Sequence, residues 1–266
     1  MLCFVSICLV FFKVNSASLS FNESGDSSIK VAIIDSGIDE NIAKVEVKKV
    51  LNAKKNDEFG HGTIVATLIN ENFLKGNYSN VNLLIYDANV LDDEGKASID
   101  DIIKGIKWAI NQNVDIINIS LGVQVRNDEL QNVVKEAAEK NIILIGAAGN
   151  TLGMKVDYPA RFSEVLSISS VDFNLQRDYI AAKGKIDYVS YGVNIDVTKV
   201  GKMQHEKEIR GTSFATANAT GIIAALLANK HISKETYRTD LESYAKPLGD
   251  NDIFGKGLLG LNEISK

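Results

Sequence analysis

The sequence contains few cysteines and few prolines, and both shortages limit what the protein can be. Its only cysteines, Cys3 and Cys8, lie among the first ten of 266 residues, so the rest of the chain has no disulfide and no thiol chemistry. Its two prolines, Pro159 and Pro247, mark no linker, and no repeat or low-complexity tract divides the chain. The length and a hydrophobic content of 45% fit one globular domain with a substantial core.

Long apolar runs and basic clusters are scarce as well. The one long apolar run, residues 1–18, is too short to span a bilayer and ends in small residues, which is typical of a signal peptide. No Lys or Arg precedes it, so an N-terminal apolar anchor and a miscalled start codon remain alternatives. We expect residues 19–266 to form the folded domain and the protein to be secreted or cell-surface associated. A net charge of −5 without a basic cluster argues against a nucleic-acid partner.

Compact apolar runs alternate with helix-like spacings along the chain. The runs at 31–34, 83–86, 114–120 and 142–148 predict buried strands. Two stretches between them, 99–106 and 130–137, repeat their apolar residues at i, i+3, i+4 and i+7, and Asn127 is a candidate cap for the second helix. This alternation predicts an α/β fold of three layers, with a mostly parallel central sheet and helices on both faces.

Open parallel sheets bind their ligands at the carboxyl ends of the strands, so the residues that follow each strand are the candidates for function. After the first strand, "DSGID" places Asp35 at the strand end, as an Asx-turn or as a functional carboxylate. "FGHGTIVATLI" places His61 between two glycines, which allow backbone or substrate to approach closely. The other histidines, His205 and His231, are interpreted as solvated, which leaves His61 as the candidate general base.

Two further positions are ambiguous singly and informative together. "IGAAGN" ends a buried strand at Asn150, as a turn residue or as an amide that donates to developing negative charge. "GTSFATANATG" places Ser213 at the start of a helix, as a cap that stabilises it by about 1 kcal/mol or as a nucleophile. With Asp35 and His61, these residues supply an acid, a base, an oxyanion donor and a nucleophile. No Gly-rich phosphate loop is present, which disfavours a nucleotide-binding protein.

The motifs "VAIIDSGI", "GHGTIVA", "VDIINISLG", "AAGN", "DYPARFSEVLSISSVD" and "GTSFATA" resemble those of subtilisin-like serine proteases in order and spacing. The resemblance covers nearly all of residues 29–228, and the chain order Asp, His, Ser is that of subtilisin. It implies the S8-type fold and a serine endopeptidase in which Ser213 attacks the peptide carbonyl, His61 takes its proton and Asp35 orients the imidazole. Asn150 and the Ser213 backbone N–H would donate to the oxyanion.

The resemblance also implies where a peptide or protein substrate lies. An extended segment would add itself as a β-strand between two backbone edges. These edges are Ser120, Leu121 and Gly122 on one side and Gly95, Lys96 and Ala97 on the other. Gly149 and Asp157 line the pocket for the residue before the scissile bond. A carboxylate at its floor would favour Arg or Lys through a charge-assisted hydrogen bond, unless Asp157 points outward into solvent.

Three departures from the family pattern modify these expectations. Ala217 and Asn218 stand where the family usually has Pro and His, and Ile64 replaces a second His. Lys44 occupies the position where the family commonly has a calcium-ligating Asp. An ammonium group cannot ligate a cation, so we expect no strong calcium site. We also expect no other metal and no cofactor. Secreted members usually carry a long prodomain, and only residues 19–30 separate the apolar start from the first predicted strand. We therefore expect that the chain folds unaided, is assisted by a separate propeptide or chain, or is a fragment. We expect a monomer.

Three functions remain to be compared. A dedicated maturation protease would be similar to lantibiotic leader peptidases, which often cut after Arg and act on secreted precursors. A broad-specificity degradative subtilase would instead tolerate apolar residues before the scissile bond. A catalytically inactive binding protein of the same fold would have lost a catalytic residue, and all four candidates are present.

Overall fold

The computed structural model describes residues 27–52, 57–76, 80–92, 94–195 and 209–262. The N-terminal apolar segment 1–18 and His205 lie outside these residues, so the predictions made for them stay predictions. Within the described ranges, no helix combines the length and the apolar character that crossing a membrane requires.

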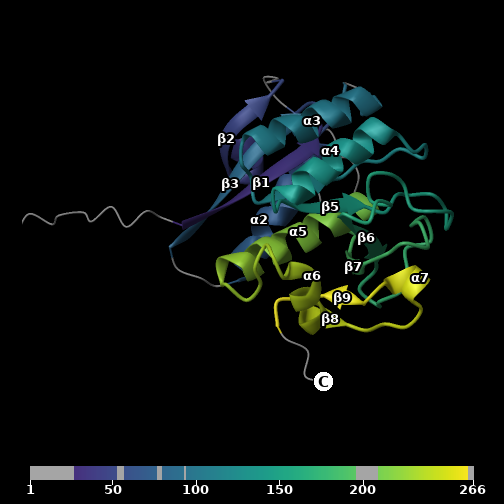
Figure 1. Cartoon of the computed structure of the whole chain (residues 1–266). Helices are drawn as coiled ribbons and strands as arrows, with labels where there is room; N and C mark the ends of the chain where they lie inside the picture. Colours follow the sequence, from purple (N-terminus) through teal and green to yellow (C-terminus); the bar gives the residue numbers. More distant parts are fainter. Residues whose placement is uncertain (1–26, 53–56, 77–79, 93, 196–208, 263–266) are drawn as a thin grey trace, which may run out of the picture.

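In the described residues, one nine-stranded sheet passes through the molecule in the order β2-β3-β1-β4-β5-β6-β7-β9-β8 (Figure 1). Every neighbouring pair is parallel except β8 and β9. The strands are β1 (Ser27–Asp35), β2 (Glu46–Leu51), β3 (Val81–Asn89), β4 (Ile116–Ile119), β5 (Ile143–Ala147), β6 (Val165–Val171), β7 (Tyr188–Tyr191), β8 (Ala245–Lys246) and β9 (Leu258–Leu259). The predicted mostly parallel sheet is confirmed.

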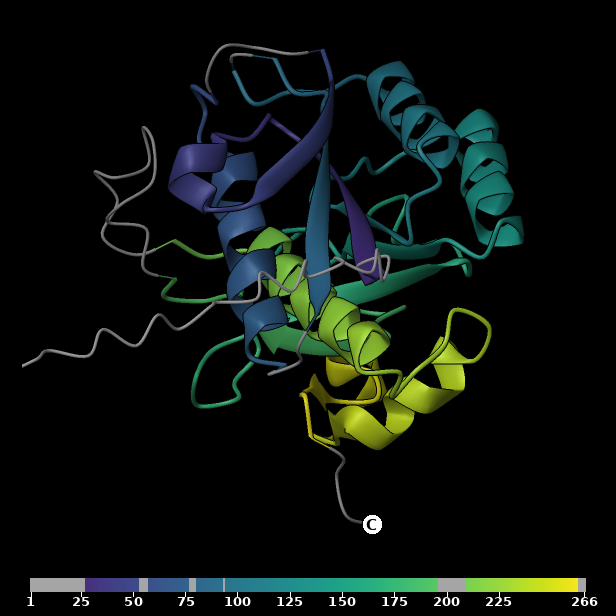
Figure 2. The ribbon, with the colours of Figure 1, turned by 90° about the vertical axis from the view of Figure 1, so that its left-hand side faces the viewer.

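Helices cover both faces of this sheet, which completes the three predicted layers. Figure 2 shows α3 and α4, in teal, on one side of the strands and α2 and α5, in blue and green, on the other. The helices are α1 (Glu40–Ala43), α2 (His61–Leu74), α3 (Ile99–Asn111), α4 (Asp128–Glu139), α5 (Thr212–Ala228), α6 (Tyr237–Asp240) and α7 (Asn251–Phe254), with a 3₁₀ turn at Leu241–Tyr244.

The apolar run of β1 is continuous because this central strand is buried on both faces of the sheet. Successive side chains of a strand point to opposite faces, and both faces of this sheet are buried. Val31 and Ile33 therefore pack into the core under α2 and α5, whereas Ala32 and Ile34 pack into the core under α3 and α4. All four are fully buried, so β1 ends rigidly at Asp35.

The helix caps follow the local sequence. The Asn127 side chain accepts from the Leu130 N–H at 2.8 Å, so the predicted cap of α4 is confirmed. At α3, Ser98 and Asp101 form a reciprocal capping box, which the sequence analysis did not identify. With α2 and α5 also beginning at the carboxyl edge of the sheet, several helix N-termini and strand ends converge at one place.

Candidate active site

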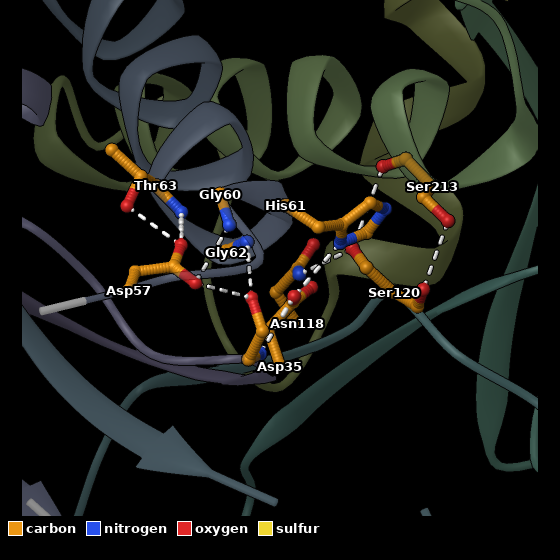
Figure 3. Close-up of polar contacts among 10 residues, drawn as sticks. Asp35, Asp57, Gly60, His61, Gly62, Thr63, Asn118, Ser120 and Ser213 are labelled. Carbon is orange, nitrogen blue, oxygen red and sulfur yellow. Dashed lines mark hydrogen bonds and ion pairs between the residues drawn. The ribbon is translucent and has the colours of Figure 1, made fainter. Parts of the chain in front are cut away.

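The predicted acid and base lie in direct contact at the carboxyl edge of the sheet. Asp35 ends β1 and is 1% exposed, and His61 is the first residue of α2. The Asp35 Oδ1 atom lies 2.8 Å from His61 Nδ1 and also accepts from the Ser36 N–H at 2.8 Å. Figure 3 shows the imidazole between Asp35 and Ser213. The buried carboxylate thus fixes the ring through Nδ1.

The glycines beside His61 allow this contact, as the sequence predicts. Gly60 has φ +87°, a conformation that L side chains rarely adopt. A Cβ on Gly62 would lie only 2.2 Å from the Gly37 carbonyl oxygen, so only glycine lets the turn after β1 approach the start of α2. Both glycines therefore serve the approach of Asp35 to His61.

Asp57 holds the start of α2, and the sequence analysis missed it. Its buried carboxylate accepts from the Gly60 N–H, the Thr63 N–H and the Thr63 hydroxyl at 2.7–2.9 Å. It also accepts from the Ser36 hydroxyl at 3.0 Å, and that hydroxyl in turn accepts from the Gly62 N–H. Asp57 thus caps α2 from three residues before its N-cap, Gly60, and ties the helix to the residue after Asp35.

The charge around His61 favours its protonated form. Burial by itself lowers the pKa of His61, because it disfavours the imidazolium. The charge and the hydrogen bond of Asp35, together with the charge of Asp57, outweigh burial and raise the pKa above its ordinary value. An imidazolium formed at this site is therefore stabilised by the surrounding carboxylates.

Ser213 lies in the first turn of α5, as predicted. Its hydroxyl donates to the Ser120 carbonyl at 2.8 Å, and no hydrogen bond joins it to His61 in this conformation. A chain of side chains anchors this contact: the Thr220 hydroxyl donates to Asn118, and the Asn118 amide donates to the Ser120 hydroxyl (Figure 3). Rotation of the Ser213 side chain is required before His61 can take its proton, and such bonds often tighten only with substrate bound.

Asn150 follows β5 and is oriented by Thr212. Its amide oxygen accepts from the Thr212 N–H at 3.1 Å and lies 3.3 Å from the Thr212 hydroxyl. Because a backbone N–H only donates, the oxygen must face Thr212, which directs the NH₂ group elsewhere. No partner for this NH₂ is found in the described part of the chain, so it is free to donate to a ligand.

Asp157 lies between the two predicted walls of the substrate pocket. A Cβ on Gly122 would lie 2.8 Å from Asp157 Cβ, and a Cβ on Gly149 would lie 2.3 Å from Asp157 Oδ2. The Oδ1 atom is buried without a hydrogen-bond partner. Burial raises the pKa of this carboxyl, although the Arg161 guanidinium opposes the change. One carboxylate oxygen is therefore buried between these segments, whereas the residue as a whole is half-buried.

The two predicted backbone edges differ in what they offer. The backbone groups of Leu121 and Gly122 have no hydrogen-bond partner among the described residues, so this edge is open to a peptide strand. On the other edge, the Lys96 carbonyl accepts from the Asp92 N–H at 2.8 Å, and the Lys96 N–H donates to the Asp92 side chain at 2.9 Å. The Gly95 N–H likewise donates to the Asp92 carbonyl at 3.1 Å, so the Gly95 carbonyl and the backbone groups of Ala97 are what this edge still offers to a substrate.

The departures from the family pattern are accommodated locally. Ile64 is buried in a small cluster with Phe214, and Ala217 is buried in the core under α2 and α5. Asn218 accepts from the Asn72 amide at 2.5 Å and donates to the Tyr191 carbonyl at 2.7 Å. None of these three side chains hydrogen-bonds to Asp35 or His61.

The remaining predicted positions lie away from this contact. Lys44 ends α1 with φ +54°, and its carbonyl accepts from Asn70. In the described ranges, no group of three His, Cys, Asp or Glu side chains is placed to hold a metal ion. The predicted absence of a strong calcium site remains a prediction, to be tested by calcium addition. His231 is exposed, which confirms its interpretation as a solvated residue.

The sequence is similar to those of known proteins over most of its length. The subtilase family pattern matches residues 26–257. A thermostable alkaline protease of Halalkalibacterium halodurans is 35% identical over 86% of this chain and 65% of its own length. Subtilisin E of Bacillus subtilis is 34% identical over 90% of this chain and 66% of its own length, so the chain spans just under two thirds of these relatives. A subtilisin of Bacillus pumilus, also 34% identical, is matched over 92% of its length.

Solved structures share the fold at lower identity. A lanthipeptide protease superimposes with a TM-score of 0.73 at 23% identity, over 87% of this chain and 85% of that one. The prenylagaramide maturation protease PagA superimposes with a TM-score of 0.70 at 24% identity, over 88% and 91%. The family pattern and the sequence relatives, together with the shared fold, show that this chain belongs to the subtilase family.

Proposed function

We propose that the protein is a serine endopeptidase that hydrolyses peptide bonds through Asp35, His61 and Ser213. The observation that carries the proposal is the imidazole held between a buried carboxylate, 2.8 Å away, and the serine in the first turn of α5 (Figure 3). A carboxylate on Nδ1 selects the tautomer whose Nε2 has a free lone pair. A general base for the serine needs that tautomer.

In the proposed reaction, the Ser213 hydroxyl leaves the Ser120 carbonyl and attacks the scissile carbonyl carbon while His61 Nε2 takes its proton. The oxyanion then accepts from the Asn150 NH₂ and the Ser213 N–H; one such donor stabilises the transition state by about 3 kcal/mol. His61 returns the proton to the leaving amine, and water hydrolyses the acyl-enzyme by the same steps. The raised pKa of His61 fits a base that must become an imidazolium.

The pocket beside this site favours a basic residue before the scissile bond. Asp157 lies between Gly122 and Gly149 with a buried oxygen that lacks a donor. A buried polar atom without a partner costs free energy, and an arginine or lysine side chain would supply both the hydrogen bond and the opposite charge. An apolar side chain would leave that carboxylate unpaired and still more deeply buried.

This specificity supports a maturation role rather than general degradation. An enzyme confined to basic sites cuts a precursor at few positions, whereas a degradative enzyme tolerates many residues. The lanthipeptide protease and PagA are named for precursor peptides, but their low identity supports the fold alone. We accordingly propose that the protein acts, outside the cell or at its surface and as a monomer, on an extended segment of a secreted precursor.

The proposal is tested by mapping cleavage sites in a diverse peptide library by mass spectrometry. Wild type, Ser213→Ala, Asp157→Asn and the charge control Glu136→Gln on the exposed side of α4 are compared. We expect cuts after Arg and Lys in wild type and the control, and none with Ser213→Ala. Asp157→Asn keeps the side-chain size and removes the charge, so its preference for Arg over Leu should fall at least tenfold.

Two outcomes would contradict the proposal at different levels. If Asp157→Asn kept the wild-type preference for Arg over Leu, this would falsify the proposed charged pocket. The proposal that the protein is an endopeptidase would be unaffected. Wild-type protein that binds library peptides without cutting them would favour the catalytically inactive binding protein instead, and a fluorophosphonate probe would then fail to label Ser213.

A further inference from the structure

A second loop lies against the one that carries Asn150. The loop that carries Asn150 runs beside residues 180–182: the Leu152 N–H donates to the Ile180 carbonyl at 2.8 Å, and the Ala182 N–H donates to the Gly149 carbonyl at 2.9 Å. Tyr179, which precedes Ile180, is 63% exposed. The segment that pairs with the Asn150 loop therefore carries a solvent-exposed aromatic side chain.

Arg210 lies over this ring. Its guanidinium carbon is 5.0 Å from the Tyr179 ring centroid, a distance typical of a cation–π contact. The next residue, Gly211, touches Asn150, because a Cβ on Gly211 would lie 3.1 Å from Asn150 Nδ2. Arg210 is thus three residues before Ser213 in the chain and adjoins the predicted oxyanion site.

The direction of a bound peptide places its leaving group here. With the residue before the scissile bond against Asp157 and its carbonyl oxygen at Asn150, the chain before the bond follows the open edge at Leu121 and Gly122. The chain after the bond must leave in the opposite direction, away from Gly122. The contacts run from Gly122 to Asp157, then to Gly149, and from Gly149 to Ala182 of the second loop. Tyr179, with Arg210 over its ring, belongs to that second loop and so lies at the end of this series away from Gly122.

Further cations gather on the same side. A Cβ on Gly153 would lie 3.8 Å from Arg177 Nη2 and 3.7 Å from Lys183 Cε, so these two basic side chains converge over one loop. Lys155 and Lys183 are partners in an isolated β-bridge. No carboxylate of the described residues lies within 4.0 Å of the charged groups of Arg177, Lys183 or Lys155.

Two carboxylates lie among these basic side chains and offset part of their positive charge. Asp178 lies 3.5 Å from Arg210 with its side chain fully buried, and its second oxygen has no hydrogen-bond partner. Burial raises the pKa of the Asp178 carboxyl, although the Ile180 N–H, Arg210 and Arg177 oppose this. Asp172 is also near, and its carboxylate accepts from two backbone N–H groups of its own turn. Within this group, the four cations Lys155, Arg177, Lys183 and Arg210 outnumber the two carboxylates Asp172 and Asp178.

We propose that Arg210, with the cations beside it, forms a subsite for acidic side chains on the leaving-group side of the cleft. The enzyme then selects segments with a basic residue before the scissile bond and acidic residues shortly after it. The inference rests on the proposed function for the position of the scissile bond. Opposite charges on the two sides of Ser213 also fix the direction in which a substrate binds.

The test uses three peptides with Arg before the cut and Glu, Ala or Lys at the three positions after it. Wild type should cleave the Glu peptide about tenfold faster than the Lys peptide, measured as kcat/KM, and about 0.5 M NaCl should reduce that ratio. Arg210→Gln and, separately, Lys183→Gln should bring the ratio toward one, and Arg210→Lys should restore part of it. Lys135→Gln, an exposed charge loss on α4, should leave the ratio as in wild type.

Binding provides a readout that does not depend on catalysis. Ser213→Ala is titrated with the same peptides carrying a fluorophore, and the Glu peptide should bind more tightly than the Lys peptide. Equal affinities, or a Glu-to-Lys ratio that is unchanged in both Arg210→Gln and Lys183→Gln, would overturn the subsite. If wild type cleaves none of the three peptides while their affinities still differ, the proposed endopeptidase activity is contradicted. The proposed subsite for acidic side chains is then still supported.

Discussion

Asp87 makes the folding stability of this protein depend on pH in an unusual direction. It lies in β3 beside β1, is 4% exposed, and one of its oxygens accepts from the Ile38 N–H at 3.1 Å while the other has no partner. Burial raises its pKa from 3.8 to about 7; the Ile38 hydrogen bond opposes the change, and the charges of Asp35 and Asp57 reinforce it. A carboxyl group at this position is therefore protonated where most carboxyl groups are ionised.

The sign of the effect follows from proton binding. Between pH values near 4 and near 7, the unfolded chain releases the Asp87 proton and the folded chain keeps it. The folded state then binds more protons than the unfolded state, so its stability falls as pH rises through this window. Each unit of pKa difference corresponds to about 1.36 kcal/mol, so a rise from 3.8 to about 7 amounts to a loss of about 4 kcal/mol above neutral pH.

Asp87→Asn isolates this contribution, because the amide keeps an oxygen to accept from Ile38 and cannot ionise. We expect the stability of Asp87→Asn relative to its parent to rise by up to about 4 kcal/mol between about pH 4 and about pH 8. The measurement is urea unfolding followed by Trp108 fluorescence. Both proteins carry Ser213→Ala so that self-digestion cannot occur.

A matched substitution separates this effect from a general loss of charge. Glu136→Gln removes an exposed carboxylate from α4 and should give a stability difference that stays constant with pH. The reasoning is refuted if the Asp87→Asn difference is equally flat, or if the substituted protein becomes relatively less stable as pH rises.

Three further predictions test the site. Asp35→Asn should lower kcat about 10⁴-fold because the imidazole loses its orienting charge, and a loss below tenfold in steady-state assays would contradict the proposed base. Thr212→Val removes the hydroxyl beside Asn150 and Gly149, so kcat should fall several-fold with KM nearly unchanged; an effect confined to KM would contradict its positioning role. Millimolar calcium should leave the Tm unchanged in a thermal scan, since Lys44 offers no oxygen ligand from its side chain, and a marked rise would show that a strong calcium site exists.

The sequence by itself determined the local features of this protein. The continuous apolar run through Val31–Ile34 predicted a strand buried on both faces, and β1 has that character. Asn127 predicted the start of α4, and the glycines around His61 predicted a close backbone approach, which the Gly62 contact confirms. These features are set by side-chain period, capping and allowed backbone angles, which act between residues near in the chain.

Only the tertiary structure decided which distant residues meet. Asp57 and Asp87 look like ordinary acidic residues in the sequence, and their burial beside Asp35 follows from the packing of α2 and the pairing of β3 with β1. The contact of Ser213 with Ser120 and the stacking of Arg210 on Tyr179 likewise join segments far apart in the chain. Such contacts depend on strand order and register, and hydrophobic periodicity specifies which face of an element is buried without specifying its neighbour.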